Sequence, residues 1–86
     1  MSKGSRPAPG PVSRALAEIL RDAWLELLIT QTKFGELLGG VPQSTISQYL
    51  NGGMTVDPDT LVKMCRVLSI DPVAAFAIAV ELANRE

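Results

Sequence analysis

The sequence predicts an all-α fold of five helices in one compact domain, and three observations carry this prediction. Apolar residues recur at intervals of three and four, the spacing of helices that bury one face. No segment shows sustained alternation of apolar and polar residues, which is the pattern of strands. With 86 residues, 47% of them hydrophobic and 20% charged, the chain has the size and composition of a single globular domain.

The amino-terminal residues 1–12 are predicted to form a flexible basic arm. They contain three prolines and two glycines, a composition that favours extended and solvated chain. Ser13 is a suitable N-cap for the first helix, which we expect to end near Ile29. The apolar stripe of this helix consists of Leu16, Ile19, Leu20, Ala23, Trp24, Leu27 and Leu28. The folded domain is therefore assigned to residues 13–86.

Residues 30–52 are predicted to form two short helices joined by a glycine turn. Thr30 can cap the first of these helices through its hydroxyl, and the glycines at 39–40 end it after about two turns. Pro42 suits the first position of the second helix, because a proline there gives up no useful N–H group. This second helix is expected to span residues 42–51.

Two further helices are predicted, each opened by an Asp-Pro pair that combines a capping carboxylate with a proline at the first helical position. The first opens at the pair Asp57-Pro58 and carries Leu61, Met64, Cys65 and Leu68 at its apolar positions. The second runs from Pro72 to about Asn84. It has one apolar stripe of Val73, Phe76, Ala77 and Val80 and another of Ala74, Ala75, Ile78 and Leu82.

A helix that is apolar all round is either fully buried or covered by a partner. A carboxy-terminal helix of a small domain is difficult to bury completely. We therefore predict a homodimer through this helix, with Ala75, Ile78 and Leu82 in the interface. Unusually deep packing of the helix within one chain is the alternative.

The helix at residues 42–51 carries side chains suited to reading base edges in the major groove of DNA. The candidates for base contacts are Gln43, Ser44, Thr45, Ser47 and Gln48, while Ile46, Tyr49 and Leu50 face the other way. Glutamine carboxamides can bond adenine at N6 and N7, and a threonine methyl group can contact thymine. The pattern indicates a preference for steps that contain A·T pairs. An ordinary solvent-facing polar helix is the alternative.

Composition excludes several other classes of site. The chain has no histidine and a single cysteine, Cys65, so we expect no disulfide within the chain, no histidine-based zinc site and no histidine-based catalytic triad. Cys65 and Trp24 are assigned to the core. We predict no cofactor, no metal and no small-molecule ligand, and we do not expect an enzyme. The longest uncharged apolar run is too short to span a bilayer, so no membrane partner and a cytoplasmic location are expected.

The chain resembles the lambda-repressor-like domain of phage repressors, Cro proteins and xenobiotic-response regulators. The likeness covers about residues 13–84, and its most specific parts are Thr30-Gln31, the run from Val41 to Ser47, Asn51-Gly52, and Leu61 to Leu68 followed by Ile70. This resemblance implies that Gln31 contacts a phosphate and braces Gln43, which reads a base. It also implies that Asn51 binds the DNA backbone.

Two features depart from the usual pattern of that family. The spacing from Gly35, where the family often has alanine, to Ile46 is one residue longer, because two glycines occupy the turn. The helix at residues 42–51 also lacks lysine and arginine, so a basic fork on guanine is not available.

The function expected from these features is sequence-specific binding of double-stranded DNA by a transcriptional regulator. The size fits a phage or prophage repressor or Cro-like protein that acts as a dimer on an operator, although the sequence does not decide between repression and activation. The formal net charge of −1 leaves few cations for the phosphates. Helix amino termini can bind phosphates through backbone N–H groups, and the expected side-chain contacts are Gln31, Lys33, Asn51, Lys3 and Arg6.

The alternative function is a protein-interaction module on the same fold with weak DNA affinity. It would be antitoxin-like or would bind a host factor. The acidic charge balance and the doubly apolar last helix favour it.

Overall fold

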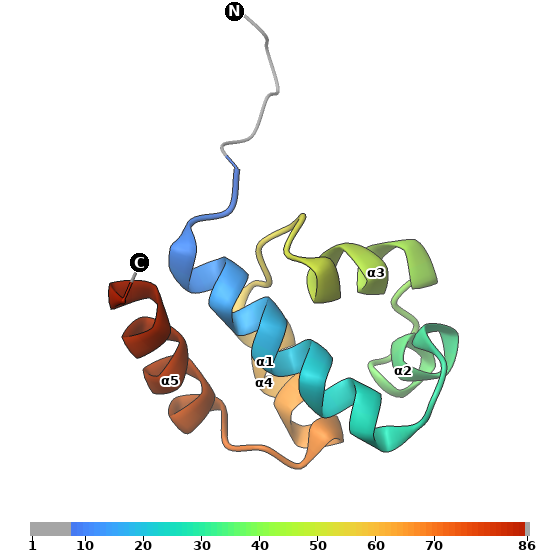
Figure 1. Ribbon diagram of the computed structural model, residues 1–86. Coiled ribbons are helices and arrows are strands. Elements are labelled where there is room, and N and C mark those ends of the chain that lie inside the picture. Colours follow the sequence, from blue (N-terminus) through green and yellow to red (C-terminus); the bar gives the residue numbers. More distant parts are fainter. Residues whose placement is uncertain (1–7, 86) are drawn as a thin grey trace, which may run out of the picture.

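The computed structural model describes residues 8–85, which form five α-helices and no strand (Figure 1). The helices are α1 (Pro11–Leu27), α2 (Gln31–Leu37), α3 (Gln43–Asn51), α4 (Pro58–Leu68) and α5 (Pro72–Asn84). The prediction of an all-α, five-helix domain is confirmed. Lys3 and Arg6, the basic residues expected in the arm, lie outside the described residues.

The amino-terminal end of α1 differs from the prediction. Gly10 occupies the N-cap position in an extended conformation, and Pro11 is the first helical residue. Proline suits this position because its φ is preset for a helix and it has no N–H group to leave unbonded. Ser13 therefore lies inside the helix, and its assignment as N-cap was wrong. Pro42 was also misplaced by one residue, since it is the N-cap of α3.

Side-chain caps begin three of the helices, as the sequence predicts. Thr30, Asp57 and Asp71 each accept a hydrogen bond from a backbone N–H group two or three residues further on, at 3.0, 3.1 and 3.0 Å. The hydrogen bonds from Thr60 lower the pKa of the Asp57 carboxyl group below its usual value. A carboxylate in this position also interacts favourably with the helix dipole. The starts of α4 and α5 are thus set by residues next to them in the sequence.

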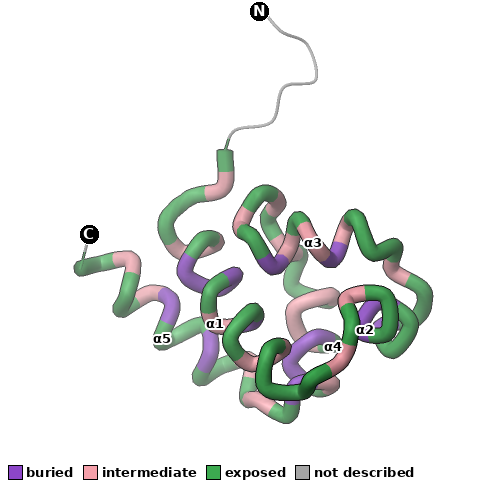
Figure 2. Tube along the Cα trace, turned by 45° about the vertical axis from the view of Figure 1, so that its right-hand side comes forward, coloured by how far each residue is buried: buried purple, intermediate pink, exposed green. Residues whose placement is uncertain are grey.

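The core is built around α1, which packs against α3, α4 and α5, while α2 packs against α3 and contributes Phe34. In Figure 2 the buried residues, drawn in purple, lie on the sides of the helices that face the other helices. The largest fully buried side chains are Phe34, Leu20, Ile46, Met64 and Cys65. Burial raises the pKa of the Cys65 thiol, so the sulfur stays protonated and acts as a small apolar core group. Trp24 is half-buried against the same core, as expected.

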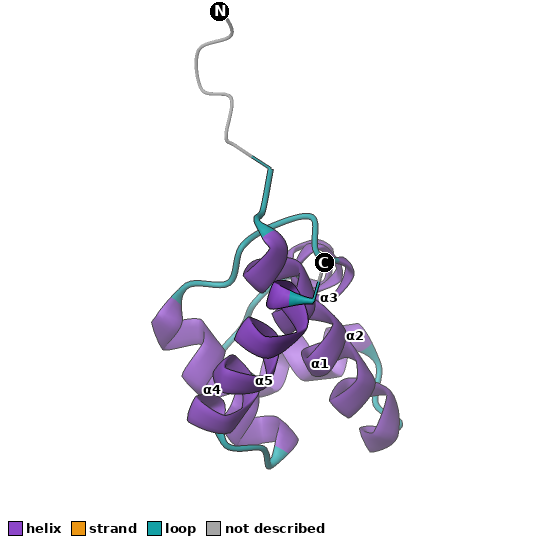
Figure 3. Ribbon diagram, turned by 60° about the vertical axis from the view of Figure 1, so that its left-hand side comes forward, coloured by secondary structure: helices purple, strands orange, loops and turns teal. Residues whose placement is uncertain are grey.

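The packing of α5 against α1 corrects the predicted dimer surface. The two helices lie side by side (Figure 3), and α5 turns Ala75 and Ala79 inward. Ala75 is only 3% exposed, so its assignment to a dimer interface was wrong. Small side chains let the two helix backbones approach closely, which explains why alanines face α1. Ile78 and Leu82 remain exposed, as expected.

The stripe that contains Val73 and Phe76 also lies outside, with exposed fractions of 76% and 49%. Large apolar side chains are therefore exposed on both sides of the buried Ala75 and Ala79, and these four residues of α5, Val73, Phe76, Ile78 and Leu82, are together called the α5 face below. No single helix in residues 8–85 is long and apolar enough to cross a membrane. Helices α4 and α5 reach the necessary length and apolar character only when they are taken together, and the chain bends by 109° between them.

Candidate nucleic-acid interface

Helix α3 lies at the molecular surface, with one side in the core and the other in solvent (Figure 2). Ile46 and Leu50 are buried, and Tyr49 is half-buried against them. Of the predicted base-reading residues, Gln43, Ser44 and Gln48 are exposed, whereas Thr45 and Ser47 are half-buried. The structure thus turns Ile46 and Leu50 inward and Gln43, Ser44 and Gln48 outward, while Thr45, Ser47 and Tyr49 are intermediate.

Gln43 is held in position by Gln31. The Nε2 group of Gln43 donates a hydrogen bond to Oε1 of Gln31 at 2.6 Å. Each glutamine is the first residue of its helix, so the amino termini of α2 and α3 lie close together at this bond. The brace that the family resemblance implies is therefore formed, in spite of the longer turn between the two helices.

The extra turn residue is accommodated by glycines. Gly39 and Gly40 have φ values of 96° and 101°, a region in which residues with a Cβ atom are strained. The carbonyl oxygen of Gly35 accepts hydrogen bonds from the N–H groups of Gly40 and Val41, both at 3.0 Å. These bonds draw the chain back against α2. The additional residue is absorbed inside the turn, and α3 still reaches the position that the brace requires.

The backbone of Gly35 lies directly against the peptide group of Val41. A Cβ atom at Gly35 would overlap the carbonyl oxygen of Val41 and lie 3.2 Å from its carbonyl carbon. Gly35 is also buried, so an added methyl group could not turn toward solvent. The observed path of the turn therefore leaves no room for a side chain at position 35.

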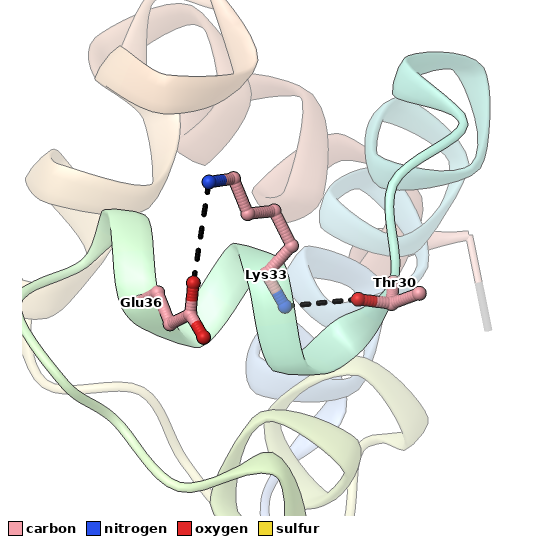
Figure 4. Close-up of polar contacts among 3 residues, drawn as sticks. All are labelled: Thr30, Lys33 and Glu36. Carbon is pink, nitrogen blue, oxygen red and sulfur yellow. Dashed lines mark hydrogen bonds and ion pairs between the residues drawn. The ribbon is translucent and has the colours of Figure 1, made fainter.

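Lys33 and the start of α2 are shown in Figure 4. The backbone N–H of Lys33 donates to Thr30, while Nζ lies 4.0 Å from Oε1 of Glu36 on the next turn. Both of these charged side chains are more than half exposed. The carboxylate of Glu36 offsets the charge of Lys33, and the predicted phosphate contact by this lysine would have to compete with it.

Gln48 and Asn51 are directed toward the carboxy-terminal end of α3. The Gln48 side-chain oxygen lies against the Cα atom of Gly53, and Oδ1 of Asn51 accepts a hydrogen bond from the N–H of Gly53 at 2.9 Å. The structure thus separates the predicted DNA contacts into two groups. Gln31 and Gln43 meet at one end of α3, while Gln48 and Asn51 lie at the other.

A hollow of about 320 Å³ lies where the end of α3 meets α1, and the sequence reasoning missed it. The residues that line it are Arg14, Ala15, Ala17, Glu18, Arg21, Leu50, Asn51 and Gly52. The one available signal was the spacing of Arg14, Glu18 and Arg21, which places three charged side chains on one face of α1. Within the described range, no group of three or more His, Cys, Asp or Glu residues could hold a metal ion.

Comparison with known proteins gives one match. A family model described as helix-turn-helix matches residues 20–74, which include the second half of α1, all of α2, α3 and α4, and the start of α5. No curated protein and no solved structure matches the chain.

Proposed function

The chain belongs to the lambda-repressor-like helix-turn-helix family, whose members are DNA-binding transcription regulators, and on that premise we propose that it binds a specific operator as a homodimer. The observation that carries this proposal is the outward face of α3, with Gln43 held by Gln31 where α2 and α3 begin. The lambda-repressor-like motif favours a phage or prophage repressor or a Cro-like protein.

In this proposal α3 enters the major groove, and its first turn meets the base edges. One Nε2 hydrogen of Gln43 is donated to Gln31, which fixes the rotamer before DNA is bound. The second Nε2 hydrogen can then be donated to adenine N7, while Oε1 accepts a hydrogen bond from the N6 amino group of the same base. Ser44, Thr45, Ser47 and Gln48 extend the contact surface along α3.

The sugar-phosphate backbone would be bound on both sides of this contact. Gln31 and Lys33 lie at the start of α2, and Asn51 lies at the end of α3. The α3 helix has no side-chain N-cap bond, because its N-cap residue is a proline, so its first N–H groups suit a phosphate oxygen. Such contacts position the protein on the duplex without reading sequence.

A gel-shift assay with DNA that flanks the protein's own gene tests the proposal. We expect one fragment to be bound in preference to competitor DNA at low and moderate salt, since base contacts add to a salt-dependent backbone term. Footprinting should then show two symmetric half-sites roughly one helical turn, about 10 base pairs, apart. Equal binding of all fragments would contradict sequence-specific recognition.

The α5 face supports dimerisation, and Phe76→Asp is expected to convert a dimer into a monomer. A charge placed in an apolar contact must be desolvated, so association becomes unfavourable. Leu25→Asp provides a matched control, because Leu25 and Phe76 are each 49% exposed and lie on different helices. Sedimentation should show the wild-type protein and L25D as dimers and F76D as a monomer. Operator affinity of F76D should fall about 100-fold through loss of linked half-site binding.

The dimer proposal is contradicted if the wild-type protein remains monomeric both alone and on the operator. It is equally contradicted if F76D sediments like L25D.

The second candidate function is a protein-interaction module, antitoxin-like or directed to a host factor, with weak DNA affinity. The apolar α5 face and the acidic charge balance favour it. This function would make no demand on the outward polar residues of α3.

A further inference from the structure

The two helices of the motif, α2 and α3, place little positive charge near the outer face of α3. No lysine or arginine lies on α3, and the lysine of α2, Lys33, is beside Glu36. Binding to DNA requires that several phosphates be neutralised or bonded. Cations for the DNA backbone in addition to Lys33 must therefore come from elements outside the two helices of the motif.

Helix α1 supplies two arginines, Arg14 and Arg21, beside the carboxy-terminal end of α3. Arg14, Glu18 and Arg21 follow one another at intervals of four and three residues, so they share one face of the helix. All three line the hollow that Asn51 closes from the end of α3. The Nη1 group of Arg14 donates to the carbonyl oxygen of Pro9 at 2.8 Å, which holds this guanidinium near the start of α1. The hollow thus combines two cations, one carboxylate and one side-chain amide.

Gly52 follows α3 in the left-handed conformation and lies beside α1. It has a φ of 80°, and an added Cβ atom would lie 3.7 Å from Cβ of Ala17 and 3.9 Å from Cα of Arg14. The close approach brings Asn51 into the same hollow as residues that precede it by 30 or more positions.

The hollow adjoins the candidate DNA surface at Asn51. Figures 1 and 3 share a vertical axis, and both place the start of α1 and all of α3 in the upper part of the molecule. Asn51 is exposed, lines the hollow and ends the helix that carries the base-reading candidates. Arg14 and Arg21 therefore lie beside the carboxy-terminal end of the helix that is proposed to enter the major groove.

We propose that this hollow binds a phosphate group of the DNA backbone, with Arg14 and Arg21 as cationic ligands and Asn51 as an amide donor. The inference rests on the proposed DNA-binding function and extends the interface onto α1. Arg14 lies outside the segment that the family model matches. Glu18 lies in the same hollow and repels the phosphate, so it limits the affinity.

Arg21→Gln tests this site against Arg66→Gln, which removes the same charge from an exposed position on α4. Dissociation constants for one DNA fragment are measured from about 0.05 to 0.3 M salt. For R21Q we expect the slope of log affinity against log salt to fall by about 0.9, which corresponds to roughly eightfold weaker binding at 0.1 M salt. R66Q should match the wild-type protein, and Glu18→Gln should bind severalfold more tightly.

The order of preference among DNA fragments should be the same for R21Q and wild type, because a phosphate contact carries no sequence information. Equal thermal unfolding of the three variants would show that the changes in affinity do not come from loss of fold.

Different failures have different meanings. If the wild-type protein binds no DNA, the proposed function fails and this inference falls with it. If the wild-type protein binds DNA and R21Q behaves like R66Q, only the phosphate site is overturned. A DNA-free titration with inorganic phosphate, followed by NMR, separates the two sources of phosphate. A response at Arg21, together with unchanged DNA binding by R21Q, would assign the hollow to free anions and overturn the proposal.

Discussion

Gly35→Ala is expected to lower the unfolding free energy by about 3 kcal/mol, a large share of the stability of a small domain. The added methyl group would overlap the carbonyl oxygen of Val41, and a backbone atom cannot move aside as the end of a flexible side chain can. The whole turn between α2 and α3 would have to shift. The corresponding fall in melting temperature is roughly 15 °C, measurable by circular dichroism.

Gly10→Ala is the matched control for this change. A Cβ atom at Gly10 has no atom within 4 Å, and the residue has an ordinary φ of −77°. We expect this variant to melt within a few degrees of the wild-type protein, because the only cost is a weaker N-cap, less than about 1 kcal/mol.

Combining Gly35→Ala with deletion of Gly40 tests why the glycine is needed. The deletion shortens the turn by one residue, which should withdraw the Val41 carbonyl group from position 35. The double variant is therefore expected to be more stable than G35A alone. Wild-type stability of G35A, or a double variant no better than the single one, would contradict the coupling between the long turn and Gly35.

Replacing both Gln43 and Gln48 by alanine is expected to weaken operator binding by roughly 100-fold or more, since each lost base contact costs about 1–3 kcal/mol. Binding to unrelated DNA should change little, because backbone contacts remain. Both side chains are exposed, so melting temperature and dimerisation should not change. Asn84→Ala, at the exposed end of α5, serves as the control.

The two single variants are expected to differ. Gln43 is already held by Gln31 at the start of α3, whereas the Gln48 carboxamide lies against Gly53 and must rotate to reach a base. Gln43→Ala should therefore account for most of the loss. If the double variant binds the operator like the wild-type protein, base reading by α3 is contradicted and the protein-interaction module becomes the better proposal.

Most helix boundaries could be predicted from the sequence because they depend on neighbouring residues. The Asp-Pro starts of α4 and α5 and the Thr30 cap of α2 are interactions over two or three residues, and all three are formed. The start of α1 was missed because Ser13 and Pro11 are both good starting signals, and proline took precedence. The inward and outward sides of α3 also followed from periodicity, because this helix is clearly amphipathic.

Other parts of the candidate site depend on residues far apart in the chain. Whether the Gln31–Gln43 hydrogen bond forms depends on the path of the backbone through the whole turn. The number of residues in the turn does not determine that path. The hollow of Arg14, Arg21 and Asn51 exists only because the end of α3 packs beside α1, a helix far from it in the sequence. No local pattern contains these contacts.

Amino-acid order alone was enough to establish the number and kind of helices, their caps and the polar face of α3, since these follow from interactions within a few residues. It could not establish which side of α5 faces inward. That helix is apolar all round, so no polar side marks the surface that faces solvent. Packing against α1 made the choice: Ala75 and Ala79 are buried, where small side chains allow a close contact, and the larger side chains Val73, Phe76, Ile78 and Leu82 were left outside.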